Sequence, residues 1–450
     1  MTKLPNILLT MCDDQRHSAM SCCDGPTADA VKTPNLDALA ARGLRFRRAQ
    51  HAGSHSPAVC SPSRAMLHSG RGPFDVAVDM VDGDLASGYR GPAGPATLGQ
   101  LLRAAGYTTH LVGKWHNYED SFRRSFDGGS SVFMAGMEDH FNLPVSQYDG
   151  QTLTKPFSTL GVHATDRFAA SASGFLRDHA AGASADRPFF LCVAFTAPHD
   201  PRRTHAQWHE RYPAQDMTLP PNFLPVHPFD HGDMDVRDEL LTSLPRDPDQ
   251  TGREISDYFA MTEHMDHAVG QIHATLEQLG LADNTLVVHT SDHGLAVGQH
   301  GLLGKQFMYD HSIRVPLLMA GPGITADTTS DARVYQHDLF PTFLQSAGID
   351  RPDRCAFESL WPVIDGESQE TYPEGVGSFY REAQRSFSVG DRKVIAYHVE
   401  DGPPRYQQFD TAADPWEQEL SLRTEAEVDA DLLEGLRAWQ RKMGDPLLTI

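Results

Sequence analysis

Cysteine is scarce in this chain, with six residues among 450. The cysteines are scattered and do not show the paired spacing of a metal cluster; they lie at positions 12, 22, 23, 60, 192 and 355. A disulfide framework would place an even set of cysteines at short, regular intervals. The sequence therefore predicts reduced thiols rather than disulfides.

Long apolar runs are also missing. No window approaches the length that a membrane-spanning helix needs. The first residues, Met1–Pro5, lead straight into an apolar run, without a signal core and a small-residue cleavage site. We therefore expect no membrane partner. The protein is expected to be cytoplasmic if Met1 is the native start, and periplasmic or secreted if a signal was removed.

The chain has no excess of basic residues, because its formal net charge is −22. Such a charge disfavours nucleic acid and anionic membrane surfaces as partners, since few cations remain to neutralise phosphates. An anionic substrate would need a local gathering of Lys, Arg and His. The 40% of hydrophobic and 22% of charged residues are ordinary for a folded globular protein.

The pattern of apolar residues predicts an α/β fold. Short apolar runs typical of buried parallel strands occur at 6–11, 108–112, 188–195, 285–290 and 315–319, and helical patterns at 34–42, 98–105, 165–180, 255–279 and 338–344. Three segments show no sustained period and are expected to be loops or irregular surface: 72–96, 117–165 and 200–253. We expect a large, mostly parallel sheet flanked by helices.

The pattern of apolar residues along the chain changes near residue 376. Short β-type runs at 394–397 and 406–409 precede an amphipathic helix near 426–443. These features predict a small antiparallel sheet with one helix. The expected division is a catalytic domain over 1–375 and a C-terminal α+β subdomain over 376–450 packed on it.

Polar groups follow four of the predicted strands where each strand ends. They are Asp13 and Asp14, the run from Lys114 to His116, His199, and the pair Asp292 and His293. Because the carboxyl ends of parallel strands meet at one edge of a sheet, these groups are expected to lie together. Four of them, Asp13, Asp14, Asp292 and His293, form an oxygen-rich set suited to Ca²⁺ or Mn²⁺. Taken singly, the Asp pair also suits a helix cap or a turn, and a lone His such as His199 is more often structural.

The stretch around Cys60 has the pattern of a short helix. Ser61 suits the N-cap, Pro62 the first helical position and Gly70 the residue after the end. Cys60 would then lie at a helix N-terminus, where the dipole and Arg64 favour negative charge. The alternative is that Cys60 is simply a small buried apolar residue.

The run Cys60-Ser61-Pro62-Ser63-Arg64 resembles the signature of the type I, formylglycine-dependent sulfatases of the alkaline phosphatase superfamily. Further motifs follow in that family's order: Gly113–His116, Pro198-His199, Asp292–Gly294, Gly301–Lys305, Arg314–Pro316 and Asp414–Glu417. Any one of them is weak. The ordered set covers almost the whole chain and is specific.

The resemblance implies a mechanism. A formylglycine-generating enzyme would oxidise Cys60 to an aldehyde, whose hydrate attacks the sulfur of the ester. The metal would be bound by Asp13, Asp14, Asp292 and His293 together with the formylglycine. Formylglycine or the sulfate would be contacted by Arg64, Lys114, His116, His199 and Lys305. His199 or Lys305 would protonate the leaving alcohol, and His116 would remove the proton that lets sulfate depart.

One departure from the family pattern bears on the metal and on the substrate. Many members carry Asn or Gln where this chain has His293. Ca²⁺ is the expected ion, with Mn²⁺ as the alternative. The pairing of Asp with His also looks like the related phosphonate monoester hydrolases, so hydrolysis of a phosphonate monoester or phosphodiester is the alternative activity.

Two further alternatives are less favoured. A two-metal phosphatase would need a second clear ligand set, which the sequence does not show. A silent binding protein in which Cys60 stays a thiol would not need the full set of acids, bases and cations.

The expected substrate is a sulfate monoester of a carbohydrate. This expectation comes from the family resemblance and from the polar segments 117–165 and 200–253. Those segments offer five groups for a sugar subsite, each of which is also readable as an ordinary solvated residue: Asp139, His140, Arg202, Arg203 and His205.

Overall fold

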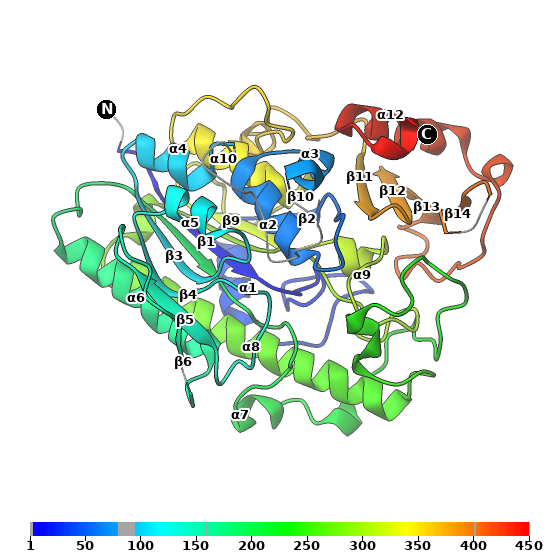
Figure 1. The fold of residues 1–450 in the computed structure, drawn as a ribbon, viewed down its shortest axis with the longest axis horizontal. Coiled ribbons are helices and arrows are strands. Elements are labelled where there is room, and N and C mark those ends of the chain that lie inside the picture. The colour runs from blue at the N-terminus through cyan, green and yellow to red at the C-terminus, as the bar shows by residue number, and fades with distance from the viewer. Residues whose placement is uncertain (1–2, 80–94, 159, 400–401, 450) are drawn as a thin grey trace.

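The structure is a computed structural model that describes residues 3–79, 95–158, 160–399 and 402–449. Its centre is a ten-stranded sheet with the strand order β10-β2-β9-β8-β1-β7-β3-β4-β5-β6 (Figure 1). Five neighbouring strands run parallel: β8 (Thr285–Ser291), β1 (Asn6–Cys12), β7 (Phe189–Ala194), β3 (Thr108–Lys114) and β4 (Gly128–Phe133). Every residue of β1, β7 and β8 is buried. The prediction of a large, mostly parallel sheet is confirmed.

The flanks of the sheet depart from the parallel arrangement. β9 (Leu317–Ala320) runs antiparallel to both β8 and β2 (Leu44–Gln50), and β10 (Thr328–Tyr335) pairs with β2 in parallel. At the other end, β5 (Pro144–Tyr148) and β6 (Phe157–Ser158) are antiparallel. The interpretation of 117–165 as loop is wrong, because that segment forms α5 (Glu119–Ser125) and the three strands β4 to β6. Its strands are short, and the pairings of β4 with β3 and with β5 both contain register shifts, so no regular local period marks them.

Helices cover both faces of the sheet. Ile7, Leu9 and Met11 of β1 pack in one core with α4 (Leu98–Ala104) and α10 (Leu339–Ser346). Leu8 and Cys12 face the opposite core with α1 (Pro34–Ala41), α6 (Ala164–Ala181) and α8 (Pro248–Gln278). This alternation follows from the period of two along a strand. The remaining α-helices are α2 (Cys60–Ser69), α3 (Pro73–Asp79), α7 (Ala206–His209), α9 (Asp310–Ile313) and α11 (Trp361–Ile364). α3 occupies the start of the expected loop 72–96, whose residues 80–94 lie outside the described part.

A second, four-stranded antiparallel sheet follows near the C-terminus (Figure 1). Its strands are β11 (Val376–Tyr380), β12 (Gln384–Val389), β13 (Arg392–Tyr397) and β14 (Arg405–Asp410). α12 (Ala430–Met443) packs Leu432, Leu436 and Trp439 against it. The small sheet with one helix is thus confirmed, while the domain division at residue 375 stays a prediction.

Buried ion pairs of one lysine connect the C-terminal sheet to α9 and to the segment after β14. Lys393 of β13 lies 2.8 Å from Asp310 Oδ1 and 2.6 Å from Glu417 Oε1. Glu417 belongs to the Asp414–Glu417 motif, and its Oε2 also accepts a hydrogen bond from the backbone N–H of Asp310. The motif therefore helps to hold β13 and α9 together.

Among the helices of the described ranges, none combines the length and apolar character that crossing a membrane requires.

One glycine is required where β3 approaches its neighbour. Gly113 has a φ of +93°, and a Cβ placed there would lie 2.1 Å from the carbonyl oxygen of Ala194. We expect Gly113→Ala to lower the free energy of unfolding by at least about 2 kcal/mol, because the left-handed backbone and the clash with a backbone atom both cost energy. Gly174 in α6 has nothing within 4 Å of such a Cβ, so Gly174→Ala should stabilise by about 0.5–1 kcal/mol. Thermal denaturation of both variants measures these effects; equal stability of Gly113→Ala and the wild type would refute the steric argument.

Candidate active site

The carboxyl edge of the parallel strands gathers the polar groups named from the sequence. Asp13 and Asp14 follow β1, Lys114 ends β3, and Asp292 and His293 follow β8. His199 lies on the loop after β7. All of these residues are buried. The expected convergence at one sheet edge is what the structure shows.

Cys60 reaches this edge as the first residue of α2. The prediction that Ser61 caps the helix is wrong, because the turn begins earlier: Ser63 N–H donates to the Val59 carbonyl, and Ser61 N–H to that of Ala58. The helix ends as expected at Gly70, whose φ is +66°. Cys60 thus lies in the first turn, where unpaired backbone N–H groups favour negative charge.

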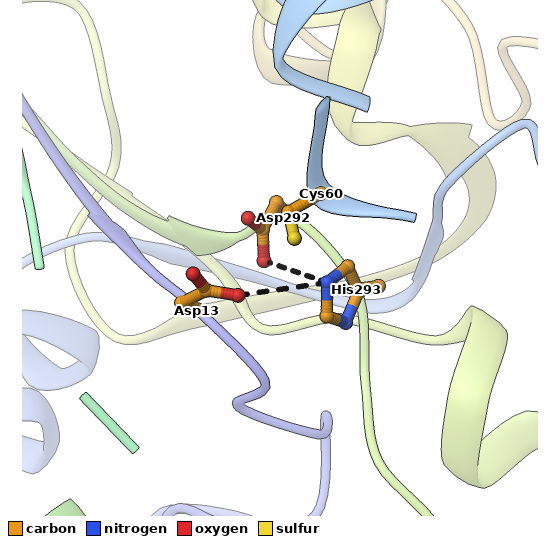
Figure 2. A group of neighbouring side chains, drawn as sticks. All are labelled: Asp13, Cys60, Asp292 and His293. Carbon is orange, nitrogen blue, oxygen red and sulfur yellow. Dashed lines mark ion pairs between the residues drawn. The ribbon is translucent and has the colours of Figure 1, made fainter. Parts of the chain in front are cut away.

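A tight group of possible metal ligands lies beside Cys60 (Figure 2). One ligand atom each from Asp13, Cys60, Asp292 and His293 lies within 4.8 Å of the others. His293 Nε2 is 3.6 Å from Asp13 Oδ1 and 3.4 Å from Asp292 Oδ1. Asp14 Oδ1 lies on the other side of the imidazole, 3.3 Å from His293 Nδ1.

Three of these atoms lack a hydrogen-bond partner among the residues that the structure describes. They are Asp13 Oδ1, Asp292 Oδ1 and His293 Nε2, and all three are fully buried. An unpaired buried polar atom is costly. Two carboxylate oxygens and one imidazole nitrogen facing each other fit a divalent cation, so the residues present suit the metal that the sequence pattern implies.

The second oxygens of the same carboxylates are paired with cations. Lys114 Nζ donates to Asp13 Oδ2, and Arg64 Nε donates to Asp292 Oδ2 over 2.9 Å. Lys305 Nζ donates to Asp14 Oδ1 over 2.8 Å. These bonds orient the carboxylates and leave Oδ1 of Asp13 and Asp292 turned toward His293.

The cations also act on Cys60. Lys114 Nζ lies 3.6 Å from Cys60 Sγ. Burial and Asp13 raise the pKa of the Cys60 thiol, but Lys114, Lys305 and His116 lower it more, so that the pKa lies well below its usual value. The position therefore favours a negatively charged group or ligand.

The imidazole of His293 is affected in the opposite direction. Burial lowers the pKa of His293, but the negative charge of Asp292 raises it by more, so that the pKa lies at about 9. Without a cation, the carboxylates therefore hold a proton on this ring.

His116 and His199 complete the set. His116 has a φ of +54°, and its buried Nδ1 has no partner among the described residues. Burial and Lys114 lower the pKa of His116, so its neutral form is favoured. His199 Nδ1 donates to the Asp200 carbonyl oxygen over 2.7 Å, and its own carbonyl accepts from His140 Nε2 over 2.9 Å.

A cavity of about 200 Å³ opens beside these groups. Cys60, His116, His199 and Lys305 line it, whereas Arg64 and Lys114 do not and are paired with the carboxylates behind Cys60. Sequence reasoning missed eight further lining residues: Pro57, Ala58, Gly136, Met137, Val236, Arg237, Asp238 and Gln306. Gln306 directly follows the Gly301–Lys305 motif. The residues at 136–137 and 236–238 belong to the two polar segments from which a sugar subsite was expected, but no local signal singles them out.

The five groups expected to form a sugar subsite do not line this cavity. Arg202 pairs with Glu254 over 2.7 Å, Arg203 with Asp139 over 3.7 Å, and His205 with Asp166 over 2.8 Å. His140 supports the His199 loop instead. Two of the five, Arg203 and Asp139, pair with each other. The sugar subsite at these residues stays a prediction.

Comparisons with known proteins identify the family. The sulfatase family model matches residues 5–349, and a model of the C-terminal region of N-sulphoglucosamine sulphohydrolase matches residues 298–442. The chain therefore belongs to the sulfatase family, the alkaline phosphatase-like hydrolases of sulfate esters. The resemblance noted from the sequence is confirmed.

Several curated relatives span most of the chain. It is 26% identical to an N-acetylglucosamine-6-O-sulfatase of Bacteroides thetaiotaomicron, over 92% of this chain and 82% of the relative. An ulvan-active sulfatase of Formosa agariphila is 27% identical, over 92% and 76%. Human iduronate 2-sulfatase is 30% identical, over 79% and 71%.

Solved structures share the fold. A protein in complex with its substrate D-glucosamine-2-N,6-O-disulfate aligns over 99% of both chains, with a TM-score of 0.80 and 24% identity. The phosphonate monoester hydrolase of Agrobacterium radiobacter aligns over 99% of this chain and 95% of its own, with a TM-score of 0.70 and 20% identity.

Proposed function

We propose that this sulfatase hydrolyses a sulfate monoester of a carbohydrate, with a formylglycine made from Cys60 as the nucleophile and one divalent cation held by Asp13, Asp14, Asp292 and His293. The observation that carries the proposal is the placement of Cys60. It lies at a helix N-terminus, within reach of buried cations and beside three metal-ligand atoms that have no hydrogen-bond partner in the described part of the chain. A formylglycine-generating enzyme is the partner that maturation requires.

The cation and the modified side chain would supply the chemistry that a thiol lacks. Ca²⁺ is the expected ion and Mn²⁺ the alternative; when bound, it would lower the pKa of the aldehyde hydrate, whose hydroxyl group is the nucleophile. Lys114 and Lys305 provide positive charge for the sulfate oxygens. Arg64 fixes Asp292 and, through it, the ligand geometry.

Two histidines suit the proton transfers. His199 lines the cavity and Nδ1 donates to the Asp200 carbonyl, so Nε2 is the nitrogen left to face the departing alcohol. Nε2 can protonate that alcohol when the ring is an imidazolium, and the ammonium of Lys305 is the other proton donor in the cavity. His116 also lines the cavity, and its depressed pKa keeps it neutral and able to accept the proton that is lost when sulfate departs.

The carbohydrate part of the proposal is supported by the relatives. One is named for a glucosamine derivative and another for ulvan, and the solved structure with the highest TM-score quoted above contains a disulfated glucosamine as substrate.

The test compares kcat/KM on phenyl sulfate, phenyl phosphonate monoester and a panel of sulfated monosaccharides, using protein matured beside a formylglycine-generating enzyme. The expected order places a sulfated sugar first and the phosphonate last. Faster turnover of the phosphonate would establish the alternative activity, and activity confined to aryl sulfates would refute the carbohydrate substrate.

Metal affinity should depend on pH through His293. Since its pKa is raised to about 9 in the ion-free protein, binding a cation must displace a proton at lower pH. We expect the apparent Ca²⁺ affinity to fall about tenfold for each unit of pH between 8 and 6. Isothermal titration of chelator-treated protein in buffers of different ionisation enthalpy measures both the affinity and the proton released. His293→Asn should flatten the dependence, and an equally flat profile in the wild type would contradict it.

A further inference from the structure

Besides the groups proposed to act on the sulfate ester, the cavity beside Cys60 is lined by a carboxylate that the proposed reaction does not use. Asp238, whose side chain is 10% exposed, lines the cavity within the segment 236–238. Its Oδ2 lies 3.9 Å from Lys305 Nζ. Asp238 therefore lies close to the end of the cavity where the sulfate ester would react.

The carboxylate of Asp238 keeps free capacity to accept hydrogen bonds. Oδ1 accepts from Arg237 over 3.0 Å, and Oδ2 accepts from Gln306 Nε2 over 2.8 Å. Each oxygen has two lone-pair directions, and each of these bonds uses one. A carboxylate cannot donate, so a ligand that uses the remaining capacity must bring a hydrogen-bond donor.

Arg237 and Gln306, which donate to Asp238, also form hydrogen bonds to other groups, and these bonds fix the position of the Asp238 carboxylate. Arg237 also holds the carboxylate of Asp200. Gln306 Nε2 donates a second bond to the Pro57 carbonyl over 2.9 Å, and its Oε1 accepts from Lys305 N–H over 2.9 Å. The donors on Asp238 are thus not free to turn toward a substrate, whereas Asp238 is a preorganised acceptor.

One part of the cavity wall is apolar, beside the polar groups already described. Met137, which is 39% exposed, and the neighbouring Val236 and Ala58 line the same cavity. Its volume of about 200 Å³ is below the roughly 300–1,000 Å³ of pockets that hold larger ligands. An acceptor with free capacity, an apolar part of the wall and a small volume match a single sugar ring, which has hydroxyl groups at its edge and C–H groups on its face.

We propose that Asp238 determines specificity by accepting a hydrogen bond from a hydroxyl or amino group on the carbon next to the sulfated position, with the ring face against Met137 and Val236. This inference rests on the proposed carbohydrate function and goes beyond it. It implies that the enzyme takes one terminal or free sulfated monosaccharide unit, and that it discriminates against esters without a neighbouring donor.

The experiment combines one substitution in the protein with the removal of one hydroxyl group from the substrate, in the manner of a double-mutant cycle. The matured enzyme and Asp238→Asn are compared on the best sulfated monosaccharide of the panel, on its analogue deoxygenated at the neighbouring carbon, and on 4-nitrophenyl sulfate. In the wild type, removing the neighbouring hydroxyl should lower kcat/KM by about 10- to 100-fold, the value of a hydrogen bond to a charged group. In Asp238→Asn most of that loss should disappear, because the amide is uncharged and only one of its two terminal atoms can still accept a hydrogen bond.

Asp235→Asn is the matched control, because Asp235 is exposed on the same segment and does not line the cavity. Asp235→Asn should keep the wild-type ratios of kcat/KM among the three substrates. If Asp238→Asn lowers turnover of the sugar, the deoxy analogue and the aryl sulfate by one common factor, Asp238 acts only through Lys305 or the fold, and the specificity role is overturned. If the wild type turns over the phosphonate but no sulfate ester, the proposed function fails first, and this result is distinguishable from the former.

Discussion

Cys60→Ala should lower kcat/KM for the best sulfate ester by at least about 10⁴-fold, because removal of a nucleophile leaves only the contribution of binding and electrostatics. The remaining groups that line the cavity, such as Lys305 and His199, are unchanged, so substrate affinity should fall far less than kcat. Steady-state kinetics and equilibrium binding of the sulfated substrate measure the two effects separately. The fold should survive, since the substitution removes one small buried side chain.

Cys355→Ala is the control for this result. Cys355 is half-buried, lies outside the cavity and contacts the Phe357 carbonyl. Its replacement should leave turnover unchanged. Retention of more than about a tenth of the activity by Cys60→Ala would exclude Cys60 as the source of the nucleophile.

Removing the divalent cation should abolish turnover and lower the melting temperature together. Without the ion, Asp13 Oδ1, Asp292 Oδ1 and His293 Nε2 remain buried without a hydrogen-bond partner among the described residues. An ion present at about 100 times its Kd stabilises the folded state by about 2.7 kcal/mol. Chelation followed by thermal denaturation and activity assays measures the loss, and adding back Ca²⁺ or Mn²⁺ separately shows which ion restores both properties.

Asp292→Asn supplies the matched control for the chelation experiment. This variant removes one charged ligand while keeping the shape, so its melting temperature should respond far less to the chelator. Full activity of the wild type after chelation, with metal analysis showing less than stoichiometric ion, would contradict the proposed metal site.

The parts of the fold that could be predicted from the sequence are those with local signals. β1, β7 and β8 are continuous apolar runs because both of their faces are covered. The gathering of Asp13, Lys114 and Asp292 at one edge then follows from parallel strands alone.

The parts that could not be predicted depend on distant partners. β2 carries Arg45, Arg47 and Arg48, which have no strand-like pattern and are compensated by acids elsewhere, such as Asp331 for Arg47 and Asp391 for Arg48. In the same way, Arg202 resembled a free sugar-binding group, although Glu254, 52 residues further on, neutralises it.

Asp238 shows the same limit for the site itself. It lies in a proline-rich stretch without any period, and only the folded chain brings it to within 3.9 Å of Lys305. The residues gathered around Cys60 belong to recognisable motifs and could be named from the sequence, whereas Asp238 and Val236, which line the cavity beside Lys305, required the structure.

The central claim is that Cys60 becomes the aldehyde nucleophile, and one mass measurement tests it most directly. Trypsin should release residues 49–64, which contain Cys60, from protein produced in its own host or beside a formylglycine-generating enzyme. The account predicts a peptide with the mass of the aldehyde or its hydrate in place of the thiol. An unmodified thiol under both conditions, in a preparation that still hydrolyses sulfate esters, would contradict it.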